Sequence, residues 1–157
     1  MQIILLTHQR ELEKTSNTGQ LVLKTLKQSS KRIVWERPSP NADLMALIEQ
    51  GGVGLLYPED TNSTRVAEIP SEVLSSIVVL DGTWQESAKM YNRSPYLHAL
   101  PRVSLSPVKS SAYKLRRNQR AEGLCTAEAV AEVLEYFGND SDASAMRVAF
   151  VRFNHGY

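Results

Sequence analysis

The sequence predicts an α/β protein with a mostly parallel sheet that is flanked by helices. Two observations carry this prediction. Short apolar runs without polar alternation, such as residues 3–6 and 77–80, suit strands that are buried on both faces. Segments with apolar residues at helical spacing lie between these runs, so strands and helices alternate along the chain. Such alternation is typical of parallel strands, which need a crossover connection.

We expect five strands and five helices. The expected strands lie at residues 2–7, 31–36, 53–57, 73–80 and 102–105. Small polar residues suited to capping precede four helices: Asn17 or Thr18 before a helix that runs to about residue 28, Asn41 or Asp43 before one that passes residue 48, Thr83 before 84–90, and Thr126 before 127–137. A last helix is expected at 143–153. The polar segment 59–70 and the segment 92–101, which contains two prolines, are expected to be irregular.

The composition narrows the possible functions. The chain has 157 residues, about one domain, and its formal net charge of +1 argues against binding polyanions through overall charge. Cys125 is the only cysteine, so we expect no intrachain disulfide and a cytoplasmic location. That cysteine is expected to be a small buried residue rather than a reactive thiolate. No apolar run has the length of a membrane span, and we expect a monomer.

Several common site motifs are absent from the sequence. It contains no Gly-x-Gly-x-x-Gly, no Gly-x-x-x-x-Gly-Lys-Ser/Thr and no Gly-x-Ser-x-Gly. The sequence therefore lacks the usual motifs of dinucleotide-binding, P-loop and α/β-hydrolase sites. The three histidines and Cys125 lack metal-ligand spacing, so no metal site is expected.

Small and polar clusters follow several of the expected strands or begin helices. They are residues 16–19, 56–58, 81–84 and 124–129. Open α/β sheets bind ligands at the carboxyl ends of their strands, so these clusters are candidates for one cofactor pocket. Asp81 is a candidate to accept ribose hydroxyls and Trp84 to stack on a base. Alternatively, Asp81 caps its helix and Trp84 belongs to the core.

A basic segment lies within this nearly neutral chain. Residues 109–120 carry five lysines and arginines and no acid, with Tyr113 among them. Two interpretations stay open from the residues alone: a solvated charged face, or a surface that binds nucleic-acid phosphates.

Several motifs occur in the order found in one known family. Asp81-Gly82-Thr83-Trp84 resembles the Asp-x-Thr-Trp signature of the DTW-domain proteins. The other matches resemble further family motifs: residues 7–11 (Thr-His-Gln-Arg-Glu), 17–21 (Asn-Thr-Gly-Gln-Leu), 55–58 (Leu-Leu-Tyr-Pro), 113–116 (Tyr-Lys-Leu-Arg) and 124–129 (Leu-Cys-Thr-Ala-Glu-Ala). The resemblance covers nearly the whole chain, so we expect residues 1–157 to form a single DTW domain.

The resemblance implies an S-adenosylmethionine-dependent tRNA-uridine aminocarboxypropyltransferase. Such an enzyme moves the 3-amino-3-carboxypropyl (acp) group to N3 of a uridine. The implied fold is SPOUT-like, with a C-terminal trefoil knot near the cofactor. The sequence departs from the family pattern at Gln9, where proline is usual, and at Gln20, where arginine is usual. The cysteine-rich segment that often begins family members is also missing, which affects expected tRNA docking more than cofactor binding.

The resemblance also implies roles for individual residues. Leu56 and Trp84 are expected to sandwich adenine, and Thr18 to hold the cofactor carboxylate at a helix N-terminus. Asp81 has two candidate roles, as a ribose ligand or as the acceptor of the N3 proton. The full expected set is Thr18, Leu56, Asp81, Thr83, Trp84, Leu124 and Thr126 for the cofactor, and Tyr113, Lys114, Arg116, Arg117 and Arg120 for RNA.

Two other function classes remain at this stage. A SPOUT-like RNA methyltransferase would use the same pocket but present the methyl carbon of S-adenosylmethionine. A non-catalytic RNA-binding module would have lost cofactor binding. The presence of Thr18, Asp81, Thr83 and Trp84 argues against that module.

Overall fold

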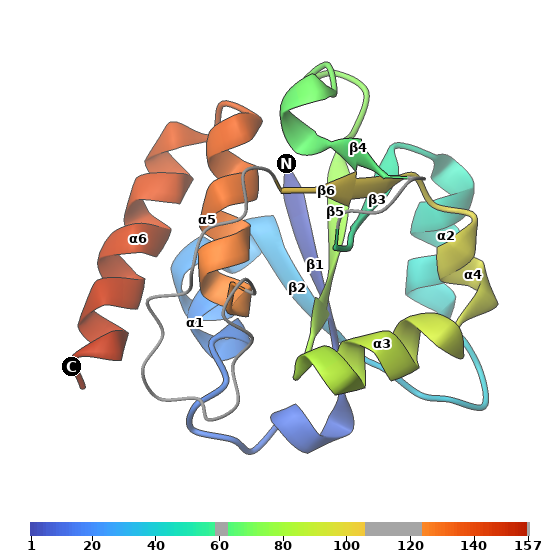
Figure 1. The fold of residues 1–157 in the computed structure, drawn as a ribbon, viewed down its shortest axis with the longest axis horizontal. Coiled ribbons are helices and arrows are strands. Elements are labelled where there is room, and N and C mark those ends of the chain that lie inside the picture. The colour runs from blue at the N-terminus through green and yellow to red at the C-terminus, as the bar shows by residue number, and fades with distance from the viewer. Residues whose placement is uncertain (59–62, 106–123, 157) are drawn as a thin grey trace.

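The protein folds around a six-stranded parallel sheet (Figure 1). The computed structural model describes residues 1–58, 63–105 and 124–156. Every strand pairing among them is parallel, and the strand order is β2-β1-β5-β3-β6-β4. The strands are β1 (Gln2–Thr7), β2 (Ser30–Val34), β3 (Val53–Leu56), β4 (Thr64–Arg65), β5 (Ser76–Asp81) and β6 (Arg102–Ser104).

Helices cover both faces of the sheet. They are α1 (Gly19–Leu26), α2 (Ala42–Gln50), α3 (Trp84–Asn92), α4 (Pro95–His98), α5 (Thr126–Tyr136) and α6 (Asp140–Asn154). On one face α1, α5 and α6 pack together, and on the other lie α2, α3 and α4. None of the helices in the described ranges has the length and hydrophobicity of a transmembrane span.

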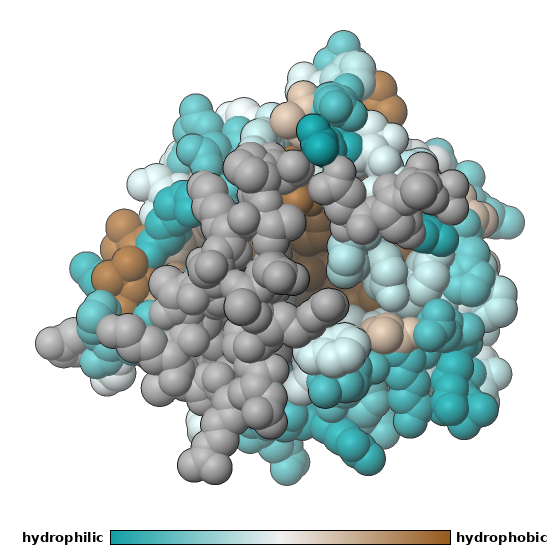
Figure 2. Space-filling model, in the orientation of Figure 1, coloured by the Kyte–Doolittle hydropathy of each residue, from teal (hydrophilic) through white to brown (hydrophobic). Residues whose placement is uncertain are grey.

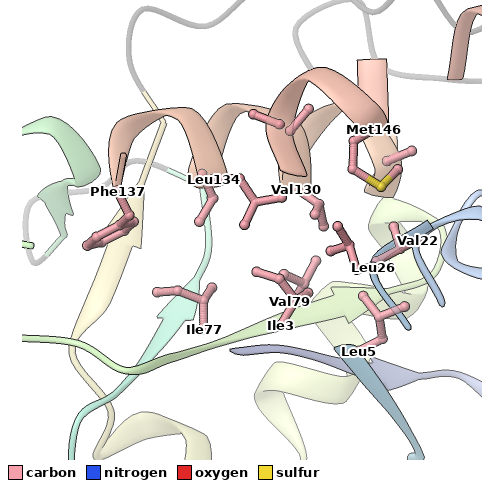
Figure 3. Close-up of a cluster of buried hydrophobic side chains, with 14 of the residues drawn as sticks. Ile3, Leu5, Val22, Leu26, Ile77, Val79, Val130, Leu134, Phe137 and Met146 are labelled. Atoms are coloured by element: carbon pink, nitrogen blue, oxygen red, sulfur yellow. The ribbon is translucent and has the colours of Figure 1, made fainter. Parts of the chain in front are cut away.

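The central strands supply apolar side chains to both faces. Along β1, Ile3 and Leu5 face one cluster while Ile4 and Leu6 face the other, because successive side chains of a strand alternate. The cluster on the α1, α5 and α6 side includes Val130 and Met146 (Figure 3). Burial on both faces explains why these strands read as continuous apolar runs in the sequence.

The predicted α/β class, with a mostly parallel sheet flanked by helices, is confirmed, and the SPOUT-like fold stays a prediction. The errors lie at the ends of elements and in short elements. Residues 59–70 were expected to be a loop, but β4 and a short 3-10 helix at Val66–Glu68 lie there. Segment 92–101 contains the short helix α4. The predicted cap at Thr126 is wrong, because α5 begins at that residue and Cys125 holds the cap position. The trefoil knot stays a prediction.

The sheet has a switch point between β1 and β5. The chain leaves β1 toward the face covered by α1, whereas it leaves β5 toward the face covered by α3. Thr7 and Asp81 are register partners at the carboxyl ends of these two neighbouring strands. Open α/β sheets form their ligand crevice at such a point.

Candidate functional site

The carboxylate of Asp81 lies at the centre of the switch point and is fully buried. Its Oδ1 accepts hydrogen bonds from Asn17 Nδ2 at 3.0 Å and from Thr126 Oγ1 at 2.9 Å. Its Oδ2 accepts from Thr7 Oγ1 at 3.0 Å and is 3.4 Å from Arg32 Nη2, with which it forms an ion pair. One side chain thus connects β1, β2, the turn before α1 and the first residue of α5.

Asn17 extends this network to a second buried carboxylate. Its Nδ2 also donates to Glu11 Oε2 at 3.0 Å, while its Oδ1 accepts from Arg32 Nη2 at 2.9 Å. The same Oδ1 accepts from the backbone N–H of Gln20 at 3.1 Å and so caps the first turn of α1. Lys14 Nζ pairs with Glu11 at 2.8 Å. The network therefore contains two carboxylates and two cations, and its formal charge is zero.

A seam between α1 and α5 lies beside this network. The hydroxyl of Thr18 is buried and accepts a hydrogen bond from Ala127 N–H at 3.1 Å. Thr18 also forms a hydrogen bond with the thiol of Cys125. The side chain of Cys125 is buried, which confirms the prediction of a buried cysteine. Burial, followed by the nearby charge of Glu128, raises the pKa of Cys125 to about 12. Such a thiol is not a reactive thiolate at neutral pH.

The turn after β5 begins α3 with a capping box. Thr83 Oγ1 accepts from Glu86 N–H at 3.1 Å, and Glu86 Oε1 accepts from Thr83 N–H at 2.8 Å. Thr83 is therefore the cap, as predicted, and Asp81 is not. Trp84 follows with 48% of its surface exposed, which excludes the interpretation of Trp84 as a core residue.

The accessible walls near the switch point are mainly apolar. Leu56, which ends β3 in register with Val79 of β5, is half-buried, as is Leu124 before α5. Figure 2 shows an apolar surface in the hollow at the middle of one face, where Figure 1 draws the middle of the sheet, above the carboxyl ends of β1 and β5. An indole and two leucines offer the kind of surface on which an adenine ring packs.

The predicted site residues thus fall into three groups. Thr18, Asp81 and Thr126 are buried and hydrogen-bonded to protein groups. Leu56, Thr83, Trp84 and Leu124 are half-buried or exposed. The expected RNA ligands Tyr113, Lys114, Arg116, Arg117 and Arg120 lie outside the described residues, so their role stays a prediction.

Sequence reasoning did not single out three members of the network. Arg32 lies in β2, where nothing in the local pattern distinguishes it from a solvent-facing strand residue. Asn17 and Glu11 lie within the motifs noted above, but spacing alone cannot show that they meet across a turn. The signal available was Asn17 itself, since a buried amide needs partners for both its oxygen and its nitrogen.

A second hollow, of about 320 Å³, lies beside β2 and the start of α2. Its polar lining residues, including Lys31, Glu36 and Asp43, are exposed or half-buried. Arg32 lines this hollow as well as joining the polar network, but neither buried carboxylate of the network, Asp81 or Glu11, lines it. We therefore place the candidate site at the switch point.

The fold and site together define a class: a doubly wound parallel α/β protein with a buried polar network at the switch point of its sheet. The DTW domain family model matches residues 1–157. The chain belongs to the DTW-domain family, which confirms the resemblance seen in its motifs.

A relative and a solved structure are similar to this chain. The tRNA-uridine aminocarboxypropyltransferase 2 of Drosophila melanogaster is 33% identical over 139 residues, 85% of this chain and 55% of that protein. The chain thus spans about half the length of this curated relative. The SAM-dependent rRNA:acp-transferase Tsr3 from Vulcanisaeta distributa has a TM-score of 0.58, 13% identity, and coverage of 99% of this chain and 84% of that chain. At that identity the likeness shows the fold alone.

We predict that Gly19→Ala destabilises the protein. A Cβ at Gly19 would overlap Asp81 Oδ2 and lie 2.8 Å from Asp81 Cγ. The four donors hold that carboxylate in place, so the overlap should cost about 1–3 kcal/mol. Glycine to alanine in a helix is otherwise favourable, which makes the sign of the change informative. Thermal unfolding measures this loss of stability, with Lys24→Ala, an exposed change in the same helix, as the control. A stability of Gly19→Ala equal to or higher than that of the wild type would contradict the packing described.

We also predict that Cys125 resists alkylation in the folded protein. With its pKa raised to about 12, the thiol stays protonated at pH 8, and burial blocks its access to a reagent. Iodoacetamide at pH 8 should modify the native chain far more slowly than the same chain in urea, as followed by intact-mass measurement. Equal rates would show that the seam between α1 and α5 is open.

Proposed function

We propose that this protein transfers the acp group of S-adenosylmethionine to N3 of a uridine in tRNA. The observation that carries the proposal is the family match over residues 1–157 together with the switch point, where four of the motifs, at 7–11, 17–21, 81–84 and 124–129, meet around Asp81. The activity named for the relative from Drosophila melanogaster supports the acp group and tRNA, and Tsr3, which shares the fold, is named as an acp-transferase that acts on rRNA. The proposal includes a cytoplasmic enzyme that uses no metal, and the C-terminal trefoil knot near the cofactor.

The residues present fit S-adenosylmethionine. Trp84 begins α3 directly after β5 and Leu56 ends the neighbouring strand β3, and both keep accessible apolar surface on which adenine could pack. Leu124 extends this wall at the start of α5. The N-terminal ends of α1 and α5 meet at the contact between Thr18 and Ala127, so two positive helix ends face the same edge of the sheet. These ends favour the carboxylate of the methionine moiety.

The reaction depends on which carbon of the sulfonium faces the uridine. The electron pair of N3 forms the new bond to Cγ of the acp group. The Cγ–S bond breaks, and its electrons neutralise the sulfonium, which leaves as methylthioadenosine. The N3 proton is lost to water or to a protein acceptor. The protein's contribution is to bury the methyl and align Cγ, because alignment supplies most of the advantage of a bound reactant pair.

The direct test incubates the full chain with S-adenosylmethionine and unmodified tRNA. We expect methylthioadenosine as the co-product and a uridine heavier by one acp group, both read by mass spectrometry of nucleosides. S-adenosylhomocysteine with a methylated nucleoside would instead identify a methyltransferase. Binding of tRNA without either product, and without calorimetric binding of S-adenosylmethionine, would identify a non-catalytic RNA-binding module.

Trp84→Ala tests the adenine wall. Loss of one base-stacking aromatic should weaken S-adenosylmethionine binding by about 1–3 kcal/mol. Tyr136→Ala is the matched control, since Tyr136 is also an exposed aromatic at 40% but lies at the far end of α5. Its calorimetric affinity should equal that of the wild type. Unchanged affinity in folded Trp84→Ala would contradict the adenine assignment.

The basic segment is tested by the salt dependence of tRNA binding. If Arg116 and Arg120 hold phosphates, replacing both with alanine should lower the slope of log affinity against log salt by about 0.7–0.9 per lost contact. Cofactor affinity should not change. Equal slopes for the variant and the wild type would show that these charges form only a solvated face.

A further inference from the structure

The acceptor sites of Asp81 are all occupied by protein donors. An ionised carboxylate offers about four lone-pair positions, and Asp81 meets four groups: Asn17, Thr126, Thr7 and Arg32. Its side chain has no exposed surface. To bind a ribose hydroxyl or take a proton from N3, Asp81 would have to give up one of these partners.

The position of Asn17 requires a side chain that both donates and accepts two hydrogen bonds, which an amide does. Its two N–H groups go to two different carboxylates, Asp81 and Glu11, and its oxygen receives Gln20 N–H and Arg32. All four hydrogen-bonding positions of the amide are therefore used. Aspartate at this place would put a third negative charge beside the other two.

The backbone of the turn is held by the same contacts. Gly19 packs so closely on Asp81 that a side chain at Gly19 would overlap its carboxylate. Thr18, between Asn17 and Gly19, reaches Ala127 of α5, and the adjoining Thr126 returns to Asp81. Asp81, the turn and the start of α5 thus form a closed ring of contacts that draws together segments from distant parts of the chain.

We propose that Asp81 is a positioning residue, which fixes the turn at residues 17–19 against the start of α5 and so sets the walls of the cofactor crevice. Asn17, Arg32 and Thr7 are the other members of this frame. In this arrangement the N3 proton leaves to water, and the contacts to the cofactor come from the apolar walls and the helix ends. The inference rests on the proposed function, because it explains how the S-adenosylmethionine site is shaped.

Thr7→Val separates this role from direct ligand contact. Thr7 is fully buried, donates to Asp81 and accepts from Arg32 Nε at 3.1 Å, and it is not among the residues expected to touch the cofactor. Valine keeps its shape and removes its hydroxyl. We expect the calorimetric dissociation constant for S-adenosylmethionine to rise about tenfold, the lower end of the range for losing one hydrogen bond to a charged group. Unchanged affinity in folded Thr7→Val would overturn the proposal.

A double-mutant cycle tests the frame as a unit. Asp81→Asn and Arg32→Gln should each weaken cofactor binding. The affinity of the double variant should equal that of whichever single variant binds the cofactor less tightly, because both changes break the same network. Additive losses would show that Asp81 acts independently of Arg32, as a direct ligand would, and would overturn the proposal. If Asp81→Asn does not fold, Thr7→Val and Arg32→Gln complete an equivalent cycle.

The pH profile separates positioning from base catalysis. Single-turnover transfer by Asp81→Asn at saturating cofactor should keep the pH dependence of the wild type and most of its rate. A rate lower by about 10²–10⁴-fold, or loss of an ascending acid limb, would identify Asp81 as the base and overturn the proposal.

Glu132→Gln is the control for general destabilisation. Glu132 is also a buried carboxylate, paired with Arg147 at 3.2 Å where α5 packs on α6. This variant should lose stability and keep its cofactor affinity. An affinity loss as large as that of Asp81→Asn would overturn the proposal. Failure of the wild type to bind S-adenosylmethionine would overturn the proposed function instead. The frame would then be tested by thermal unfolding, in which the stability losses of Asp81→Asn and Arg32→Gln should not be additive.

Discussion

A carboxylate that is fully removed from water must meet hydrogen-bond donors on every side, since a buried charge without partners is strongly unfavourable. Asp81 imposes this requirement at the carboxyl end of the central strand β5. The requirement is met by Thr7 from β1, Arg32 from β2, Asn17 from the turn before α1 and Thr126 from α5. Four segments of the chain are therefore placed by one side chain, and the crevice is defined where they meet.

The parallel sheet makes that placement possible. The register of β1 against β5 sets Thr7 opposite Asp81. The register of β1 against β2 sets Arg32 opposite Leu5, two residues before Thr7. The chain leaves the two strands toward opposite faces, so α1 and α3 pack on different faces of the sheet. The apolar clusters on the two faces hold the strands, and the polar network occupies the one edge where apolar packing stops.

Much of the fold was predictable from the sequence because burial on both faces leaves a local signal. Uninterrupted apolar runs located the central strands, and small polar residues located the starts of helices, with Asn41 and Thr83 as observed side-chain caps. The two-residue strand β4 and the four-residue helix α4 are too short to produce a pattern of either period. Their conformation depends on their neighbours in space, which no window of sequence contains.

The candidate site was predictable in a different way. Its residue types were visible as motifs, but their partners were not, because Asp81 bonds to Thr7, 74 positions away, and to Thr126, 45 positions away. The helix start at Thr126 was expected from its capping ability, whereas its hydroxyl is used by Asp81 and the cap position is one residue earlier. A side chain with two possible uses takes the one that a buried charge demands, since leaving that charge unpaired costs more than losing a cap.

In the proposed transfer, the separation of polar and apolar residues bears on which of the three carbons of the sulfonium reacts. These carbons lie on one sulfur atom, so a small shift of the bound cofactor changes which one faces an acceptor. Such selection requires walls that move little, because geometry contributes to the rate only while it is maintained. Exposed apolar side chains such as Trp84 supply contact area but do not fix their own backbone. The ends of β1 and β5, the turn before α1 and the start of α5 are instead held by the charge-neutral network around Asp81. We infer that this is why a buried ionic network is placed where apolar packing would be simpler to build.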